Sequence, residues 1–244
     1  ALMLAAAGVN AHAALSAGDI AFTSFNADED GLSFVTFKNI DANTTIFFSD
    51  NEWGGSAFNT GESYNQWNSG SSQIDAGSVI RFSAYDKTTL SASTGTLSRV
   101  TVASNTNWGI STTADTIYAY LGSSATAPTT FLSAISNATD GSLVGTGLTE
   151  GTNAIRLNSI ATGATPDYAE YNGARSGAAS FDAYKAQVNN VANWTIDTTN
   201  GSYASTLPNT TAFSVTAVPE PKNYAMFLAG LGLMGLIARR KGKN

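Results

Sequence analysis

The feature that most restricts the fold is a series of short segments in which apolar and polar residues alternate. Residues 19–25 (DIAFTSF) and 32–37 (LSFVTF) are two of them, and the polar cluster 26–31 separates the pair. Alternation with a period of two places apolar side chains on one face of a β-strand, so this pair predicts an early hairpin or meander. Further candidate strands are 44–49, 78–84, 98–103, 115–121, 130–135, 153–157 and 212–216.

Strands of this length, joined by turns rich in Gly, Ser, Thr and Asn, predict an all-β fold of the immunoglobulin-like sandwich type. One segment departs from the pattern. Ser180 is suited to cap a helix over residues 181–191, in which Phe181, Tyr184 and Val188 share one face. The expected body, residues 14–217, is therefore a single β-sandwich with one short added helix.

Charge and cysteine content limit the classes of function. The body holds 7 Lys and Arg against 17 Asp and Glu, a net charge of −10, whereas the segment from Val218 onward carries +4. An acidic surface without clustered cations is unsuited to nucleic acid, because phosphate contacts need Lys and Arg. The chain has no cysteine, so no disulfide stabilises the fold, and a body of this length can bury a sufficient core without one.

Residues 1–13 (ALMLAAAGVNAHA) have the character of a secretory signal peptide. The segment is apolar and ends in Ala11-His12-Ala13, which fits an A-x-A cleavage site, although a basic n-region is missing. Cleavage after Ala13 would remove His12, the one histidine of the chain. We therefore expect export and a mature protein without histidine.

Residues 218–244 consist of three consecutive parts. Pro219, Glu220 and Pro221 come first, an apolar run over 224–238 follows, and Arg239, Arg240, Lys241 and Lys243 end the segment. A helix of this apolar run is about 22 Å long, short of the roughly 30 Å hydrocarbon core, so we expect a marginal transmembrane helix. The cations place the C-terminus in the cytoplasm and the body outside.

This order of parts resembles the PEP-CTERM sorting signal. The resemblance implies recognition of Pro219, Glu220 and Pro221 by an exosortase, an integral-membrane cysteine protease of Gram-negative bacteria that make exopolysaccharide. It assigns 224–238 to the membrane helix and Arg239, Arg240 and Lys241 to the stop signal. The expected route is export, a transient stay in the inner membrane, and delivery to the cell surface or extracellular matrix.

The body resembles lamin-tail-like domains. Residues 34–39 (FVTFKN) followed by 45–53 (TIFFSDNEW) are similar to the opening of such domains, and 108–111 (WGIS) leading to 115–120 (DTIYAY) to a later strand pair. The resemblance implies a compact sandwich that binds other molecules.

Catalytic candidates are few. A mature chain without histidine and cysteine excludes a Ser-His-Asp or Cys-His triad and the usual zinc ligand sets. Carboxylates beside aromatic residues remain, namely Asp50 and Glu52 next to Trp53, and Glu62 near Tyr64 and Trp67. Because glycosidases use two carboxylates and aromatic platforms, a secreted carbohydrate-active enzyme is the alternative function.

A second candidate is a cation site. Asn26, Asp28 and Asp30 match the start of an N-x-D-x-D-G calcium loop, but Phe37 stands where the bidentate acid belongs. A solvated acidic turn is the preferred interpretation, with calcium as the alternative.

The four tryptophans divide by context. Trp53 and Trp67 lie in segments rich in Gly, Ser and Asn and are candidates for stacking on sugar rings. Trp108 and Trp194 lie near apolar patterns, which favours burial. The sequence therefore indicates an exported, non-enzymatic structural, adhesive or glycan-binding component of a biofilm or exopolysaccharide. An ice- or surface-binding role is a further alternative. The threonines do not recur at a fixed period, which counts against a flat ice-binding face.

Overall fold

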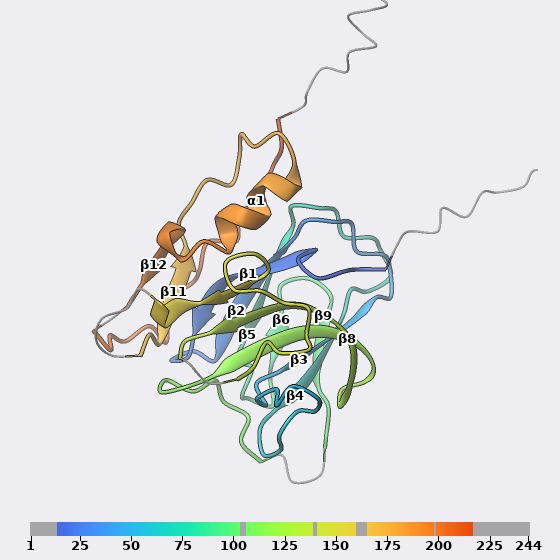
Figure 1. The fold of residues 1–244 in the computed structure, drawn as a ribbon, viewed down its shortest axis with the longest axis vertical. Coiled ribbons are helices and arrows are strands. Elements are labelled where there is room, and N and C mark those ends of the chain that lie inside the picture. The colour runs from blue at the N-terminus through green and yellow to red at the C-terminus, as the bar shows by residue number, and fades with distance from the viewer. Residues whose placement is uncertain (1–13, 103–105, 139–140, 160–164, 198, 217–244) are drawn as a thin grey trace, which may run out of the picture.

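A computed structural model describes residues 14–102, 106–138, 141–159, 165–197 and 199–216 (Figure 1). Within them the strands form two six-stranded sheets. The first sheet has the order β12-β11-β1-β2-β5-β6. Its strands are β1 Ile20–Asn26, β2 Gly31–Thr36, β5 Val79–Ser83, β6 Ser91–Ala92, β11 Tyr168–Tyr171 and β12 Trp194–Ile196. The expected hairpin is present, since β1 and β2 pair antiparallel, with Phe22 opposite Phe34.

The second sheet has the order β10-β9-β8-β3-β4-β7. Its strands are β3 Thr45–Ser49, β4 Tyr64–Asn68, β7 Thr96–Arg99, β8 Thr116–Ser124, β9 Ala127–Ser136 and β10 Ala154–Arg156. Only the β9–β10 pair is parallel among the ladders of the described strands. The chain crosses from one sheet to the other between β2 and β3, which is how a sandwich is built from consecutive strands.

The core between the sheets is aromatic. Phe34 and Phe82 from the first sheet meet Phe48 and Trp67 from the second. Ring centroids of Phe48 and Phe82 lie 4.9 Å apart, and those of Phe34 and Trp67 lie 5.6 Å apart. All four side chains are fully buried. Edge-on aromatic contacts of this kind stabilise the interface beyond the area that they bury.

A second apolar cluster covers the outer face of the second sheet. Tyr118, Tyr120 and Phe131 point outward from β8 and β9, where Trp53 and Phe58 from the loop after β3 pack on them. The second sheet is thus buried on both faces. This explains why β3 (TIFFS) and β8 (TIYAY at its start) have near-continuous apolar sequences rather than strict alternation.

The remaining elements follow β10. They are the 3-10 turns η1 Leu157–Ser159 and η2 Val191–Asn193 and the helix α1 Phe181–Val188, which lies beside the β11–β12 end of the first sheet (Figure 1). Tyr184 and Val188 form the buried face of α1. The last described segment, residues 203–216, returns along this end of the body, and we call it the C-terminal strap.

Most predicted strands are confirmed. The segments 44–49, 78–84 and 153–157 contain β3, β5 and β10, and the segments 115–121 and 130–135 overlap the longer strands β8 and β9. The all-β, two-sheet fold is confirmed as well, and the added helix begins at Phe181 as expected. It ends at Val188 instead of residue 191, because Asn189 caps it and η2 continues the chain.

Four strands escaped prediction, namely β4, β6, β11 and β12. The predicted strand 98–103 overlaps β7 at Ser98 and Arg99 only, and the predicted strand 212–216 was wrong. β4, β11 and β12 are short and carry polar residues, so their alternation is weak. Residues 212–216 form no strand. The amide of Phe213 donates to Gly77 O and that of Ser214 to Arg175 O, so the strap bonds to two different loops and makes only an isolated bridge at Val215.

Candidate functional site

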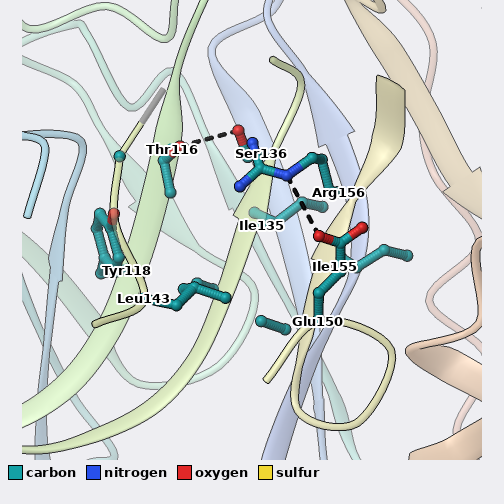
Figure 2. A pocket seen from close by; sticks show the side chains of 11 residues that line it. Thr116, Tyr118, Ile135, Ser136, Leu143, Glu150, Ile155 and Arg156 are labelled. Carbon is teal, nitrogen blue, oxygen red and sulfur yellow. Dashed lines mark hydrogen bonds and ion pairs between the residues drawn. The ribbon is translucent and has the colours of Figure 1, made fainter. Parts of the chain in front are cut away.

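A small pocket lies over β8, β9 and β10 on the outer side of the second sheet (Figure 2). Its polar groups are bonded to one another. Arg156 Nε donates to Glu150 Oε2 at 3.3 Å and Arg156 Nη1 to Ala138 O, while Thr116 Oγ1 donates to Ser136 Oγ at 2.8 Å. The cavity has a volume of about 10 Å³, which holds about one water molecule. It has no room for a sugar ring.

The predicted carboxylates Asp50, Glu52 and Glu62 lie around one loop closure. Ser63 donates from its backbone nitrogen and its hydroxyl to Asp50 Oδ1, at 2.6 and 2.8 Å, and the Glu62 amide donates to Asn51 Oδ1 at 3.1 Å. Glu52 instead accepts from the side chain of Asn59. These hydrogen bonds join the two ends of the 50–63 loop, so the side chain of Asp50 stabilises the loop.

Burial dominates the electrostatics of Asp50. The side chain is fully buried, and its Oδ2 has no hydrogen-bond partner. Burial raises the pKa of Asp50 to about 8; hydrogen bonds from Ser63 oppose the rise, and the nearby Glu62 carboxylate adds to it. At neutral pH Asp50 is therefore mainly protonated. A general acid needs such a pKa, but it also needs contact with a substrate, and Asp50 has no exposed surface.

A second carboxylate pair lies at the start of β11. Burial and the adjacent carboxylate of Asp197 raise the pKa of Asp167 to about 6. Burial would also raise the pKa of Asp197, but hydrogen bonds from Gly201 and Thr199 lower it to about 2. The pair fixes the loop that leads into the C-terminal strap, and sequence reasoning missed it because 30 residues separate the two aspartates.

The candidates for sugar stacking, Trp53 and Trp67, are both buried. Trp67 lies on the inward face of β4, is fully buried, and donates from Nε1 to Thr94 O at 2.7 Å. Trp53 is 7% exposed and donates to Val144 O at 3.0 Å. Strand β4 brings Trp67 into the inner apolar cluster, and the 50–63 loop brings Trp53 into the outer one, so neither ring is available to stack on a sugar.

The expectation for Trp108 is wrong, whereas Trp194 is buried as expected. Trp108 is 38% exposed, and the Arg99 guanidinium lies 4.2 Å from its ring centroid. Arg99 Nη2 donates a hydrogen bond to Tyr85 O at 2.6 Å, which fixes the guanidinium. Trp108 stands between Asn107 and Gly109, and this loop composition was the signal that could have identified it as exposed.

The side chains of the candidate calcium loop bind backbone amides. Asn26 Oδ1 accepts from Glu29 N at 3.1 Å, Asp28 Oδ2 from Tyr203 N at 2.6 Å, and Asp30 Oδ1 from Ile110 N at 2.6 Å. The three therefore point to different segments instead of to one centre. Among the residues that the structure describes, no group of three or more His, Cys, Asp or Glu side chains is arranged to hold a metal ion.

The predicted sorting residues lie outside the described ranges, as do the expected signal peptide 1–13 and transmembrane helix 224–238. This applies to Pro219, Glu220 and Pro221 and to Arg239, Arg240 and Lys241. None of the helices in the described ranges combines the length and the apolar character needed to cross a bilayer.

Comparison with known proteins identifies the C-terminal segment. Residues 217–241 match the family model of the PEP-CTERM protein-sorting motif. The match contains the Pro-Glu-Pro triplet, the apolar run and the first three terminal cations, so the predicted motif is confirmed. No curated protein and no solved structure matches the chain.

Proposed function

We propose, from the PEP-CTERM motif at residues 217–241, that this protein is exported, processed by an exosortase, and left on the cell surface or in the extracellular matrix as a non-enzymatic structural or glycan-binding component. The motif is the observation that supports export and processing by an exosortase. The acidic, cysteine-free body suits a soluble component outside the cell, since its net charge of −10 opposes self-association.

The glycan-binding part of the proposal rests on Trp108. An exposed indole held in place by Arg99 offers a rigid apolar surface for a sugar ring, with Lys87 and Asp86 close by as hydrogen-bonding groups. Arg99 also donates to Lys87 O at 3.2 Å, which brings these residues together. The alternative function, a carbohydrate-active enzyme, has less support, because Asp50 is buried and Glu52 is occupied by Asn59.

We assign the sandwich to the lamin-tail-like type as part of the same proposal. The segments 34–39 and 45–53, which carry that resemblance, form the crossing from β2 in the first sheet to β3 in the second. Lamin-tail-like domains mostly mediate binding, which agrees with the proposed role.

Fractionation of the native host tests the sorting route. Strains with and without the exosortase are separated into membrane, surface and medium fractions, and the protein is followed with an antibody to the body. We expect a shortened protein at the surface or in the medium of the first strain, and a full-length membrane-bound protein in the second. Full-length membrane-bound protein in both strains would refute the route.

Replacement of Trp108 tests glycan binding. We expect Trp108→Ala to weaken binding to the exopolysaccharide of the host by about tenfold, by analogy with the stacking of a nucleic-acid base on an aromatic side chain, which is worth about 1–3 kcal/mol. Leu207→Ala is the matched control, because Leu207 is 73% exposed and lies on the strap. Sedimentation with the purified polysaccharide measures both variants. Equal binding by both would remove Trp108 from the proposal.

A further inference from the structure

The sorting motif follows the folded body without a spacer. The motif match begins at residue 217, and the residue before it, Thr216, still belongs to the body, because its amide donates to Ala178 O at 2.9 Å. Figure 1 shows the red end of the described chain leaving the body on the side of α1. Pro219, the first residue of the recognised triplet, is three positions farther.

Chain geometry turns this short connection into a distance limit. Each residue of a fully extended chain spans at most about 3.6 Å, so Pro219 lies within about 11 Å of Thr216. By the same measure Tyr224, the start of the apolar run, lies within about 29 Å. A protease that binds 219–221 is larger than either distance, and it therefore meets the body surface next to Thr216 unless the strap detaches.

The strap is firmly attached. Phe213 is buried, and its ring lies 5.1 Å from that of Tyr184 and 5.7 Å from that of Tyr171. The Tyr184 hydroxyl donates to Ser214 O at 2.7 Å, and Arg175 Nη1 donates to Thr211 O at 3.0 Å. Detachment would expose a phenylalanine and break these bonds together, so the attached strap is the state in which a partner meets the tail.

The surface at this point has a definite composition. Its residues are Ala179 ahead of α1, Asp182 and Ala183 in the first turn of α1, and Val215 and Thr216 of the strap, all exposed. The two segments are joined by the bridge between Ala178 and Val215, and we call this surface the exit face. Val215 is 37% exposed, one of the few large apolar side chains so exposed among the described residues.

The charges of the exit face favour a protein partner over a lipid surface. Asp182 pairs with Lys185 at 3.1 Å, and the five residues of the exit face include no Lys or Arg. Anionic headgroups attract clusters of Lys and Arg, and the acidic body as a whole would be repelled by them. Small and apolar side chains with one exposed carboxylate suit contact with another protein.

We propose that the exit face is a docking surface for the membrane protease that processes the tail, so that the protease binds the folded body and the Pro-Glu-Pro triplet together. This inference rests on the proposed exosortase processing. It adds that recognition extends beyond the motif, to Val215 and the first turn of α1.

Processing rates of full-length variants in the native host test the inference. We expect Val215→Asp to slow conversion of the full-length form about fivefold or more, as loss of a central interface contact does. Val144→Asp is the matched control, because Val144 is 73% exposed and lies over the other sheet. Equal thermal unfolding midpoints of the two variants would show that the body is intact in both.

Two further variants separate the alternatives. A flexible Gly-Ser insertion between Thr216 and residue 217 uncouples body and tail, so docking predicts slower processing. Unchanged rates with both the insertion and Val215→Asp would overturn docking, because the protease would then read the tail alone. Phe213→Ala loosens the strap, and faster processing of this variant would likewise overturn docking in favour of strap detachment.

The lipid alternative and the proposed function have separate readouts. Flotation of the unprocessed full-length protein with vesicles of anionic phospholipid, reduced by Val215→Asp, would assign the exit face to the membrane surface and overturn protease docking. Failure of the proposed function looks different, because the unaltered protein would then remain full-length whether or not the host has the protease.

Discussion

At the scale of single residues, Asp50 has the clearest consequence. The unfolded chain gives an aspartate its ordinary pKa of 3.8, whereas burial raises that of Asp50 to about 8 in the folded protein. Between these values the folded state holds a proton that the unfolded state has lost. The free energy of unfolding therefore falls as pH rises from about 4 to about 8, and the loss is complete above the folded pKa.

Asp50→Asn tests this reading. Asparagine retains an oxygen for the two Ser63 donors and replaces the protonated oxygen by an amide that does not titrate. We expect the variant to be similar to the unaltered protein near pH 5 and more stable at pH 8, by an amount on the order of 2–5 kcal/mol. Urea unfolding at several pH values measures the difference.

Asp75→Asn is the control for that experiment, because Asp75 is exposed and its Oδ1 accepts a hydrogen bond from the side-chain amide of Gln73 at 3.0 Å. It should leave the pH dependence unchanged. A pH profile of Asp50→Asn parallel to that of the unaltered protein would show that Asp50 does not hold the proton.

At the scale of elements, the 50–63 loop acts as a cover for the second sheet. We expect Trp53→Ala to lower the free energy of unfolding by about 3–5 kcal/mol, as truncation of a buried aromatic residue does. Since Trp53 also bonds Val144 O, amide hydrogen exchange should rise in both the 50–63 loop and the 141–149 loop. Exchange in β1 and β2 should stay slow, and uniform acceleration would contradict a local cover.

The elements also show what the sequence could predict. β1 and β2 were predictable because apolar residues alternate in them with small polar ones such as Thr23 and Ser33, although every residue of both strands is buried. β4 (YNQWN) was not, because its outward Tyr64 enters the outer cluster, its inward Asn65 is buried and polar, and only Trp67 has the expected inward apolar character. Residues 212–216 of the strap were wrongly predicted as a strand. Their backbone hydrogen bonds go to two different loops, and the local sequence does not indicate which segments they pair with.

The candidate site was less predictable than the fold. The Gly, Ser and Asn around Trp53 and Trp67 made them candidates for sugar stacking, but their exposure depends on which sheet face each ring lies against, and that is a property of the tertiary structure. Conversely, Trp108 belongs to a loop whose neighbouring apolar strand suggested burial, yet the side chain rests on Arg99. The sorting motif was predictable because its three parts follow one another in the linear sequence.

At the scale of the whole molecule, two apolar clusters form the core of the described body. The chain has no cysteine, and the described residues hold no set of three metal-ligating side chains of the His, Cys, Asp and Glu types. We therefore expect the thermal unfolding midpoint to be the same in calcium at millimolar concentration and in EDTA. Calorimetric titration with calcium provides the second measurement, and saturable heat would restore the calcium alternative at Asn26, Asp28 and Asp30.

The exposure of Trp108 makes the protein its own optical probe. Trp53, Trp67 and Trp194 are buried, so a neutral quencher such as acrylamide reaches one indole out of four readily. Quenching curves should therefore resolve an accessible fraction that Trp108→Phe removes. Any molecule that covers this ring will change that fraction in the unlabelled protein, which allows ligands to be screened by fluorescence before their chemistry is known.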